Sequence, residues 1–474
     1  MPMTLAFFCF SFWACQSVPP DEPVSSTETS PLFEYVQNVD SAFSYEVQDT
    51  LLGEGHTTYL IRMVSQRWLT EAEVKDPLWW HWLTVVVPDG VENPTGLLFI
   101  GGGSRNREQP TEADQMLVQT ALATQTVVAD LHNVPNQPVE FVSDTFGPRV
   151  EDELIAYGWR KFMENGAKRE DAEWLARLPM TTAAVRALDV LQELDEAALT
   201  PSLERFVVAG GSKRGWTTWT TGIVDDRVVG IVPIVIDLLN VVPSFEHHWQ
   251  AYGEWAPAVG NYVYEGIMEW QDSQEYQQLL AYTEPFSYRD QLDMPKLLIN
   301  ATGDQFFLPD SWQFYWDSLP GEKHLRYVAN GEHSLRGTDA IESLIAFHGH
   351  IAHNQPRPKF DWRVEGGKII IDTDPNFPPE AIQLWQASNP EGRDFRVDVI
   401  DRSWTAQPVL TQEGGHYELS IPEPEAGYAA FFVELTFPTQ LPVPLKMSTG
   451  VVVTPDTYPH EPYQAENPKG TPVK

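Results

Sequence analysis

Cysteine is almost absent from this chain of 474 residues, which has only Cys9 and Cys15. Beyond residue 15 the chain therefore has neither a disulfide nor a thiol nucleophile. Basic residues are also scarce, since 31 Lys and Arg stand against 67 Asp and Glu and give a formal net charge of −36. Nucleic-acid binding depends on neutralising phosphates, so we expect no nucleic-acid partner and an acidic, well-hydrated surface.

The apolar run that opens the chain lacks the length to span a bilayer. It ends at residue 15, and a polar stretch rich in Pro and Ser follows it. This pattern predicts an export signal over 1–15 and a flexible tether over 16–32. We therefore expect an exported protein in the periplasm, on the outer membrane or outside the cell.

Ala14 followed by Cys15 resembles the cleavage site of bacterial lipoproteins. A lipid on Cys15 would tether the protein to a membrane. Two features depart from that pattern: Phe12 replaces the usual Leu, and no Lys or Arg precedes the apolar run. An ordinary cleaved signal peptide and a misassigned start codon are the alternatives.

One serine lies where a strand pattern changes into a helix pattern. Residues 205–219 read Arg-Phe-Val-Val-Ala-Gly-Gly-Ser-Lys-Arg-Gly-Trp-Thr-Thr-Trp, with the hydroxyl at Ser212. In α/β-hydrolases such an elbow holds a nucleophilic serine clear of the sheet. Gly210 fits the usual Gly-x-Ser-x-Gly motif, but Arg214 occupies the second small position and Gly215 comes one place later. Because a Gly-Ser pair after a buried strand is more often a plain turn, the prediction depends on finding partners for Ser212.

An acid and a base follow Ser212 in the order that this fold uses. Asp304 and His333 each come after another apolar run, so the chain order is Ser, Asp, His. We predict that Ser212 is a nucleophile, His333 its general base and Asp304 the acid that orients the imidazole. Asp310 is an alternative acid, although its place after Pro309 is more typical of a helix start.

The pattern of strands and helices predicts an α/β fold with a mostly parallel sheet of the α/β-hydrolase type. Antiparallel opening strands are expected at 56–64 and 79–88. The later strands are expected at 96–103, 126–131, 205–211, 228–237, 295–300 and 323–328, with helices near 112–123 and 180–194. The predicted hydrolase domain spans 33–355.

An aromatic insertion separates the strand at 228–237 from the acid. Residues 238–293 lie where such hydrolases carry a helical lid, which roofs the site and limits substrate size. Within it we predict substrate contacts from His247, His248 and Trp249, although a helical layer packed only for stability is the alternative.

Beyond residue 356 the helical patterns give way to short alternating runs. These runs, at 360–364, 368–371, 382–387, 395–400, 417–421 and 429–437, predict a small C-terminal all-β sandwich over 356–462. Its simplest role is that of a packed accessory domain, and binding of a carbohydrate or a partner is the alternative. The tail from Thr454 is rich in proline, and we expect it to be extended.

Several motifs resemble the PhoPQ-activated pathogenicity-related protein family. They are Trp79-Trp-His-Trp-Leu83, Leu178-Pro-Met180, Gly210-Gly-Ser-Lys-Arg-Gly-Trp216, Ile236-Asp-Leu-Leu-Asn240, Phe245-Glu-His-His-Trp-Gln-Ala-Tyr252, Phe306-Phe-Leu-Pro-Asp310 and Arg393-Asp-Phe-Arg396. The resemblance covers about 33–462 and implies an exported α/β-hydrolase-like body with a C-terminal β domain. It implies little about the reaction. One eukaryotic branch is a secreted proliferation repressor, for which a dipeptidyl-peptidase-like activity has been proposed.

An acyl-transfer reaction also needs donors for the oxyanion. We predict the amide of Lys213 at the helix start and an amide of Gly102 or Gly103 after the earlier strand. The basic side chains beside Ser212 resemble, weakly, the elbow of glucuronoyl esterases, so Arg214 is a candidate for binding an acidic substrate. A structural salt bridge from one of these side chains to Asp225 or Asp226 is the alternative.

Two further clusters invite a functional interpretation. Glu151, Asp152 and Glu153 could hold a peptide's amino terminus, but Glu151 and Glu153 do not share a helix face, and acids in a first turn also complement the helix dipole. His350 and His353 lie two and five residues after His348, so on a helix the three side chains point in different directions and do not share a face that could bind a metal. We therefore predict no metal and no organic cofactor.

Three hypotheses follow for the function. The first is a serine hydrolase that acts on a small ester or amide substrate. The second is a serine peptidase similar to dipeptidyl peptidases. The third is a non-catalytic signalling or binding protein on a hydrolase fold, since a fold alone does not decide function.

Overall fold

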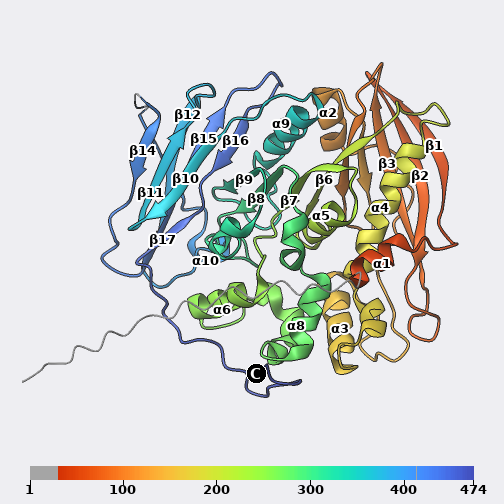
Figure 1. Ribbon diagram of the computed structural model, residues 1–474, viewed down its shortest axis with the longest axis horizontal. Helices are drawn as coiled ribbons and strands as arrows, with labels where there is room; N and C mark the ends of the chain where they lie inside the picture. Colours follow the sequence, from red (N-terminus) through yellow and green to blue (C-terminus); the bar gives the residue numbers. More distant parts are fainter. Residues whose placement is uncertain (1–29, 411, 413, 474) are drawn as a thin grey trace, which may run out of the picture.

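One large sheet runs through the whole molecule. The computed structural model describes residues 30–410, 412 and 414–473, and within them a sheet of 14 strands spans the view in Figure 1. In order across the sheet the strands are β1 (Ser44–Gly53), β2 (His56–Arg67), β3 (Leu78–Pro88), β5 (Val128–Leu131), β4 (Thr95–Ile100), β6 (Arg205–Gly211), β7 (Val228–Ile234), β8 (Lys296–Ala301), β9 (Lys323–Val328), β16 (Leu445–Ser448), β15 (Tyr428–Phe437), β12 (Ala381–Asn389) and β13 (Thr405–Pro408), with β17 (Val452–Thr454) paired to β15.

The centre of the sheet is parallel. Strands β5, β4, β6, β7, β8 and β9 pair in parallel, whereas β1, β2 and β3 form an antiparallel edge. The parallel strands are apolar along almost their whole length because helices cover both faces. The carboxyl ends of β6, β8 and β9 meet at one edge, so the segments after these strands lie close together.

Helices cover both faces of the parallel strands. The helices α1 (Pro31–Gln37), α4 (Arg177–Glu193) and α5 (Lys213–Val224) contact one another on one face, and α2 (Gln115–Thr124) and α9 (Ala340–Ala352) pack together on the other. Each layer buries its own apolar cluster against the sheet. None of the described helices is long and apolar enough to cross a membrane.

The insertion between β7 and β8 is helical, in agreement with the lid predicted over 238–293. It contains α6 (Val241–Tyr252), α7 (Gly260–Tyr264) and α8 (Gln274–Thr283), joined by short 3-10 turns. Helix α3 (Glu151–Glu164) packs against α7 and α8, although it lies far from them in sequence. These helices together form the lower part of the molecule in Figure 1, so the lid has two sources in the chain.

The C-terminal region is a β-sandwich, as predicted. A second sheet of β10 (Phe360–Glu365), β11 (Lys368–Thr373) and β14 (His416–Leu419) packs on β12, β15 and β16 through one apolar cluster. The larger layer of this sandwich is not separate from the hydrolase sheet, because Ser448 of β16 pairs with Leu325 of β9. No sequence pattern indicated this junction.

The prediction of a strand at 395–400 is wrong. Residues Val397–Ile400 form the short helix α10, whose first amide, at Val397, donates to the carbonyl of Gly303 at 3.0 Å. This tertiary contact turns the chain beside the loop after β8. A short alternating run cannot report such a contact.

The last residues lie along the lid. Residues 455–473, here called the C-terminal strap, follow β17 and run beside α6 and α8 (Figure 1). The amide of Lys469 donates to the carbonyl of Glu269 at 2.8 Å. The amide of Gln274 donates to the carbonyl of Thr471, also at 2.8 Å. The strap therefore connects the β-sandwich to the lid.

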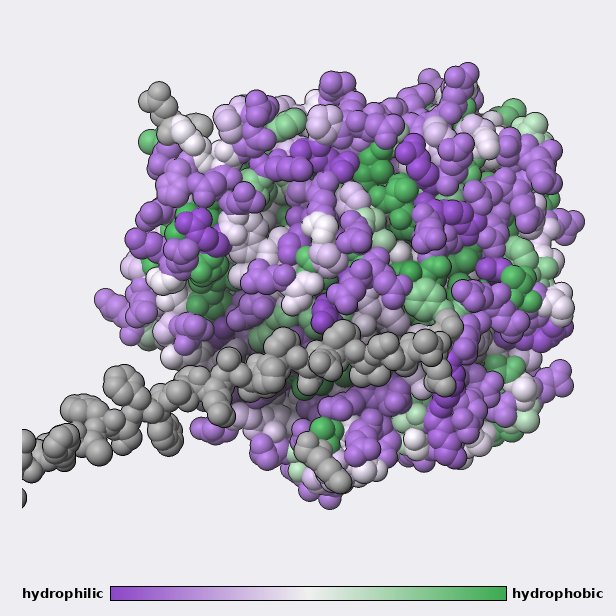
Figure 2. Space-filling model, viewed as in Figure 1, coloured by the Kyte–Doolittle hydropathy of each residue, from purple (hydrophilic) through white to green (hydrophobic). Residues whose placement is uncertain are grey.

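The predicted fold class is confirmed, as an α/β-hydrolase-like sheet with a helical lid and a C-terminal β-sandwich. The domain boundaries remain predictions. The predicted export signal, with Cys9 and Cys15, and most of the predicted tether lie outside the described residues. Hydrophilic residues cover most of the face in Figure 2, in keeping with the acidic composition.

Candidate active site

Ser212 lies at a tight turn between β6 and α5. Its φ of 57° and ψ of −125° are unfavourable for a residue with a side chain. Two glycines permit the turn: a Cβ on Gly210 would lie 2.7 Å from the carbonyl oxygen of Arg214, and one on Gly215 would lie 2.7 Å from a methyl group of Ile236. Gly215 thus meets the packing requirement, which explains how Arg214 can occupy the position usually held by a small residue.

His333 lies between Ser212 and Asp304. Its Nε2 is 2.9 Å from Ser212 Oγ, and its Nδ1 is 2.9 and 2.8 Å from the two carboxylate oxygens of Asp304. With Nδ1–H donating to the carboxylate, Nε2 is left to accept the serine proton. The structure therefore brings the three predicted residues together in the predicted order of contact.

Neighbouring residues hold both Asp304 and His333 in place. Asp304 is buried and also accepts a hydrogen bond of 2.8 Å from the amide of Phe306. The ring of Phe306 lies 4.2 Å from that of His333, centroid to centroid. The amide of His333 donates to the side chain of Gln305 at 3.0 Å. One loop after β8 thus supplies the acid and holds the imidazole in place.

Asp310, the alternative acid, belongs to a different cluster. Its Oδ1 accepts from His247 Nε2 at 2.9 Å and its Oδ2 from Arg393 at 2.7 Å. Burial acts to raise the pKa of Asp310, but Arg393 and His247 outweigh it and hold that pKa well below its ordinary value. The hydroxyl of Tyr458 in the C-terminal strap contacts the other nitrogen of His247 at 2.8 Å. This buried cluster therefore joins the lid, the sandwich and the strap.

Two cavities adjoin Ser212. One, here called the closed pocket, has a volume of about 40 Å³ and lies beneath the lid, with mostly apolar walls from α3, the start of α4, α5, the segment after β7, the loop after β8 and the insertion. The other is an open groove of about 420 Å³ on the side of α2 and α9, and its lining includes His333, Met116, Leu335 and Ile341. The serine thus separates a small closed pocket from a larger open one.

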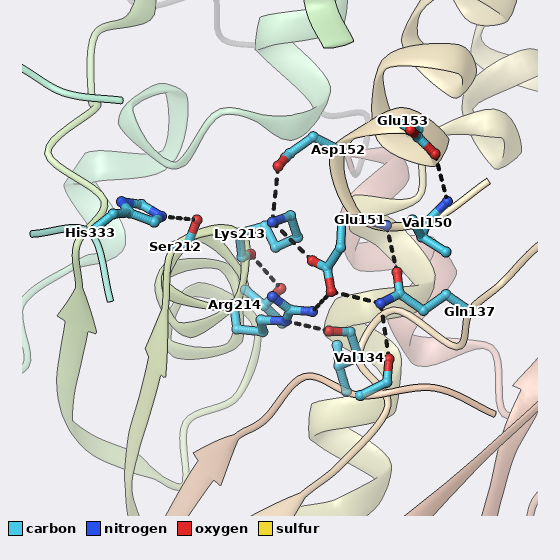
Figure 3. A network of polar contacts seen from close by, with 12 residues as sticks. Val134, Gln137, Val150, Glu151, Asp152, Glu153, Ser212, Lys213, Arg214 and His333 are labelled. Atoms are coloured by element: carbon cyan, nitrogen blue, oxygen red, sulfur yellow. Dashed lines mark hydrogen bonds and ion pairs between the residues drawn. The ribbon is translucent and has the colours of Figure 1, made fainter. Parts of the chain in front are cut away.

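The basic residues after Ser212 are paired within the chain. Lys213 Nζ lies 3.0 Å from Glu151 and 3.0 Å from Asp152, and Arg214 donates to Glu151 at 2.6 Å and to the carbonyl of Val134 at 2.6 Å (Figure 3). Burial acts to raise the pKa of Glu151, but Arg214 and Lys213 outweigh it and hold that pKa below its ordinary value.

The alternative to substrate binding, a structural salt bridge from a basic side chain beside Ser212, agrees with this network, but its partners are Glu151 and Asp152. Asp225 pairs with Arg227 instead. Among the three acids at the start of α3, Glu151 and Asp152 converge on one cation, whereas Glu153 accepts from the amide of Val150. Arg214 points into this network and is not among the residues that line the closed pocket or the open groove.

Lys213, Gly102 and Gly103 lie after the strands where we expected them, and their role as oxyanion donors stays a prediction. Lys213 begins helix α5 directly after Ser212, as an amide donor must. Gly102 packs against the guanidinium of Arg214, where a Cβ would meet a nitrogen at 2.8 Å, and Gly103 has a φ of 136° beside the side chain of Asn133. Both glycines therefore serve close packing on the loop after β4.

The three predicted lid contacts do not line the pockets beside Ser212. His247 is bound to Asp310, and His248 Nε2 accepts from the amide of Ala256 at 3.1 Å. The ring of Trp249 lies 4.7 Å from that of Tyr463 in the strap. His248 and Trp249 both pack against Trp255, and Phe245, one turn earlier on α6, is the residue of this helix that lines the closed pocket.

The histidines near the end of α9 point to separate partners. His348 Nε2 contacts the hydroxyl of Thr126 at 2.8 Å, His350 the carbonyl of Pro356 at 3.0 Å and His353 that of Thr124 at 2.7 Å. Within the described part of the chain, no group of three or more His, Cys, Asp or Glu side chains is arranged to hold a metal ion.

Trp159 of α3 and Arg177 at the start of α4 line the closed pocket and were not predicted from the sequence. Asp152, which also lines it, was considered only as a binder of a peptide's amino terminus. Arg177 is buried and donates to the carbonyl of Lys213 at 2.8 Å. The one signal for it in the sequence is an arginine directly before the Leu178-Pro-Met180 motif, at a helix start where a positive charge is unfavourable.

Residues 32–396 match the PhoPQ-activated pathogenicity-related protein family. The chain belongs to this family. The matched residues include Ser212, Asp304 and His333, together with Glu151, Asp152 and Arg177 of the network beneath the lid. The family resemblance predicted from the sequence motifs is thereby confirmed.

The chain is also similar to individual proteins. It is 37% identical over 464 residues to autocrine proliferation repressor protein A of Dictyostelium discoideum, which covers 92% of each chain. Among solved structures, acetyl xylan esterase 1 from Thermoanaerobacterium sp. JW/SL YS485 has a TM-score of 0.47 at 11% identity and covers 68% of this chain and 92% of its own. The acylaminoacyl peptidase of Pyrococcus horikoshii has a TM-score of 0.39 at 13% identity, over 69% and 52% of the two chains.

Proposed function

We propose that the protein is a serine hydrolase that cleaves an ester or amide bond through an acyl-enzyme. The observation that carries this proposal is the contact of His333 with both Ser212 and Asp304. A serine hydroxyl is a poor nucleophile on its own, and a neutral imidazole that can accept its proton removes this obstacle. The strained backbone at Ser212, which exposes the hydroxyl at the end of β6, supports the same conclusion.

The reaction would proceed in two halves. Ser212 Oγ attacks the acyl carbon while its proton moves to His333 Nε2, and the imidazolium then protonates the leaving group. Asp304 holds the Nδ1 proton and stabilises the imidazolium. Water deacylates the serine by the same proton transfers in reverse order. The amides of Lys213 and of Gly102 or Gly103 are the proposed donors to the oxyanion.

A dipeptidyl-peptidase-like reaction is less well supported. Such an enzyme needs carboxylates that hold the substrate's ammonium group. Here Glu151 and Asp152 converge on an ammonium group that belongs to the chain, that of Lys213. A substrate would have to displace Lys213 to use them. We therefore place the general ester or amide hydrolase before the peptidase.

A non-catalytic role is the remaining alternative, and the name of the Dictyostelium relative describes a repressor of proliferation. A fluorophosphonate probe, which labels only activated serines, separates these hypotheses by intact-mass measurement. We expect one adduct on the purified protein and none on Ser212→Ala or His333→Ala. A folded protein that stays unlabelled under a broad range of probe sizes would favour the binding role.

We further propose that the protein is exported and, if Cys15 is lipidated, membrane-tethered, on the basis of residues 1–15 alone. Fractionation of cells that express the full chain or Cys15→Ser tests this point. Export with membrane retention only in the unchanged chain would support lipidation, and identical release of both proteins would exclude it.

A further inference from the structure

The closed pocket beside Ser212 contains a buried arginine without a carboxylate partner. Arg177 is only 3% exposed and lines this pocket. Its guanidinium donates to the carbonyl of Lys213 and lies 4.5 Å from the ring centre of Trp216. Among the described residues no carboxylate lies within ion-pair distance of it, and its Nε–H has no hydrogen-bond partner. Because arginine keeps its charge in proteins, this is a costly arrangement.

The acid in the same pocket is already bound. Asp152 lies 3.0 Å from Lys213 Nζ and accepts a hydrogen bond of 3.1 Å from the hydroxyl of Tyr262. Burial lowers the pKa of Arg177, which is the direction expected for a cation whose charge is not fully balanced. The charge of Asp152 and the hydroxyl of Tyr262 act in the opposite direction and balance the arginine only in part.

The local balance of charge is positive in a strongly acidic protein. Arg177, Lys213 and Arg214 lie in one connected network with Glu151 and Asp152, so three cations meet two carboxylates. One positive charge remains beside Ser212, although the whole chain has a formal net charge of −36. An anion that enters this pocket would complete the network.

We propose that this pocket binds a carboxylate of the substrate at Arg177, so that the preferred substrates are esters or amides with a small, negatively charged acyl group. The volume of about 40 Å³ limits that group to a few carbon atoms while the lid is closed. Carboxylate and guanidinium form paired, charge-assisted hydrogen bonds, and the apolar walls exclude the water that would weaken them. The proposal rests on the proposed hydrolase function for the fate of the substrate but not for its binding.

The test compares propanoate with propanamide, which have nearly the same shape and differ in charge. Binding is measured by ligand-observed saturation-transfer NMR on Ser212→Ala, so that no turnover is needed. We expect propanoate to bind at least tenfold more tightly than propanamide. The preference should vanish in the double variant that also carries Arg177→Gln, which keeps a polar side chain and removes the charge.

Arg186→Gln provides the matched control. Arg186 is a buried arginine on the same helix, paired with Asp189 at 3.1 Å and absent from the pocket lining. The propanoate preference should be unchanged in Ser212→Ala with Arg186→Gln. Equal binding of acid and amide, no binding of either, or a preference that survives Arg177→Gln would each overturn the proposal.

The test also separates this proposal from the proposed function. If Arg177→Gln does not fold, the comparison of acid with amide on Ser212→Ala still decides whether the site prefers an anion. A protein that prefers propanoate yet takes no fluorophosphonate would keep the anion site and lose the hydrolase function. A labelled protein without the preference would keep the function and lose the anion site.

Discussion

Asp304 and Asp310, six residues apart in the chain, each pair with a histidine, and only the Asp304 pair includes Ser212. Asp304 binds His333, whose other nitrogen contacts Ser212 Oγ. Asp310 binds His247, whose other nitrogen contacts Tyr458 in the strap. Both pairs are hydrogen bonds between a carboxylate and an imidazole, but their roles differ. The first pair can activate a hydroxyl, whereas the second links segments that are distant in the chain.

Substitution of each acid by asparagine separates these roles. Asp304→Asn leaves His333 without the partner that fixes its tautomer, and we expect the rate of fluorophosphonate labelling at Ser212 to fall about 10³- to 10⁴-fold. The measurement is the time course of adduct formation by mass spectrometry, on protein that unfolds with a cooperative thermal transition.

Asp310→Asn is the matched control and should affect stability instead. It leaves the buried guanidinium of Arg393 without its carboxylate, a change that costs about 3–5 kcal/mol in the free energy of unfolding. The folded fraction should still be labelled at close to the wild-type rate. Loss of labelling in folded Asp310→Asn, with labelling retained in Asp304→Asn, would reverse the assignment of the acid.

At the scale of elements, the C-terminal strap fastens the lid. The ring of Tyr463 packs 4.7 Å from Trp249 and 5.0 Å from Trp255, centroid to centroid, and backbone hydrogen bonds follow at Lys469 and Val473. Because the strap has no regular structure of its own, its attachment depends on these contacts.

Tyr463→Ala should loosen the strap. Loss of two aromatic contacts and of the partly buried ring lowers the free energy of local opening by about 2 kcal/mol, which corresponds to roughly thirtyfold faster hydrogen exchange at the amides of Lys469 and Val473. Tyr264→Ala is the control, since Tyr264 is also a lid tyrosine but is 71% exposed. Equal exchange rates in both variants would show that Tyr463 does not hold the strap.

Sequence patterns predicted the elements that follow local rules. The parallel strands, the elbow at Ser212 and the order of acid and base all depend on short apolar runs and turn residues, and the structure has them where expected. The elements that were missed depend on distant partners. The helix at Val397–Ile400 forms against Gly303, and β16 joins the central sheet through Leu325.

The same distinction applies to the site. Ser212, Asp304 and His333 each follow a strand and could be found from their neighbours in sequence. Arg177 and Asp152 reach the pocket only because α4 packs against α5 and α3 packs against α7 and α8, which no local pattern reports. His247 and His248 stand in an aromatic motif that suggested substrate contact, but in the folded protein His247 contacts Tyr458 of the strap and His248 packs against Trp255.

For the molecule as a whole, buried neutral histidines predict sensitivity to acid. Burial lowers the pKa to about 4 for His81 and His132, and to about 3 for His248 and His348. In the unfolded chain these groups take up protons near pH 6.5, whereas in the folded protein they stay neutral to much lower pH. The unfolded state thus binds more protons between these limits, and stability falls as the pH drops from 6.5 toward 4.

His348→Gln isolates one part of this effect. At pH 7.5 the variant loses the contact with Thr126 and should be less stable than the wild type by about 1 kcal/mol. At pH 4.5 the wild type also bears the cost of keeping His348 neutral, roughly 2–3 kcal/mol at 1.36 kcal/mol per pKa unit, and the variant does not. We therefore expect the difference measured by urea unfolding to vanish or change sign between these pH values. His460→Gln, at an exposed histidine, should keep the wild-type pH dependence, and a His348→Gln difference that stays constant with pH would refute this account.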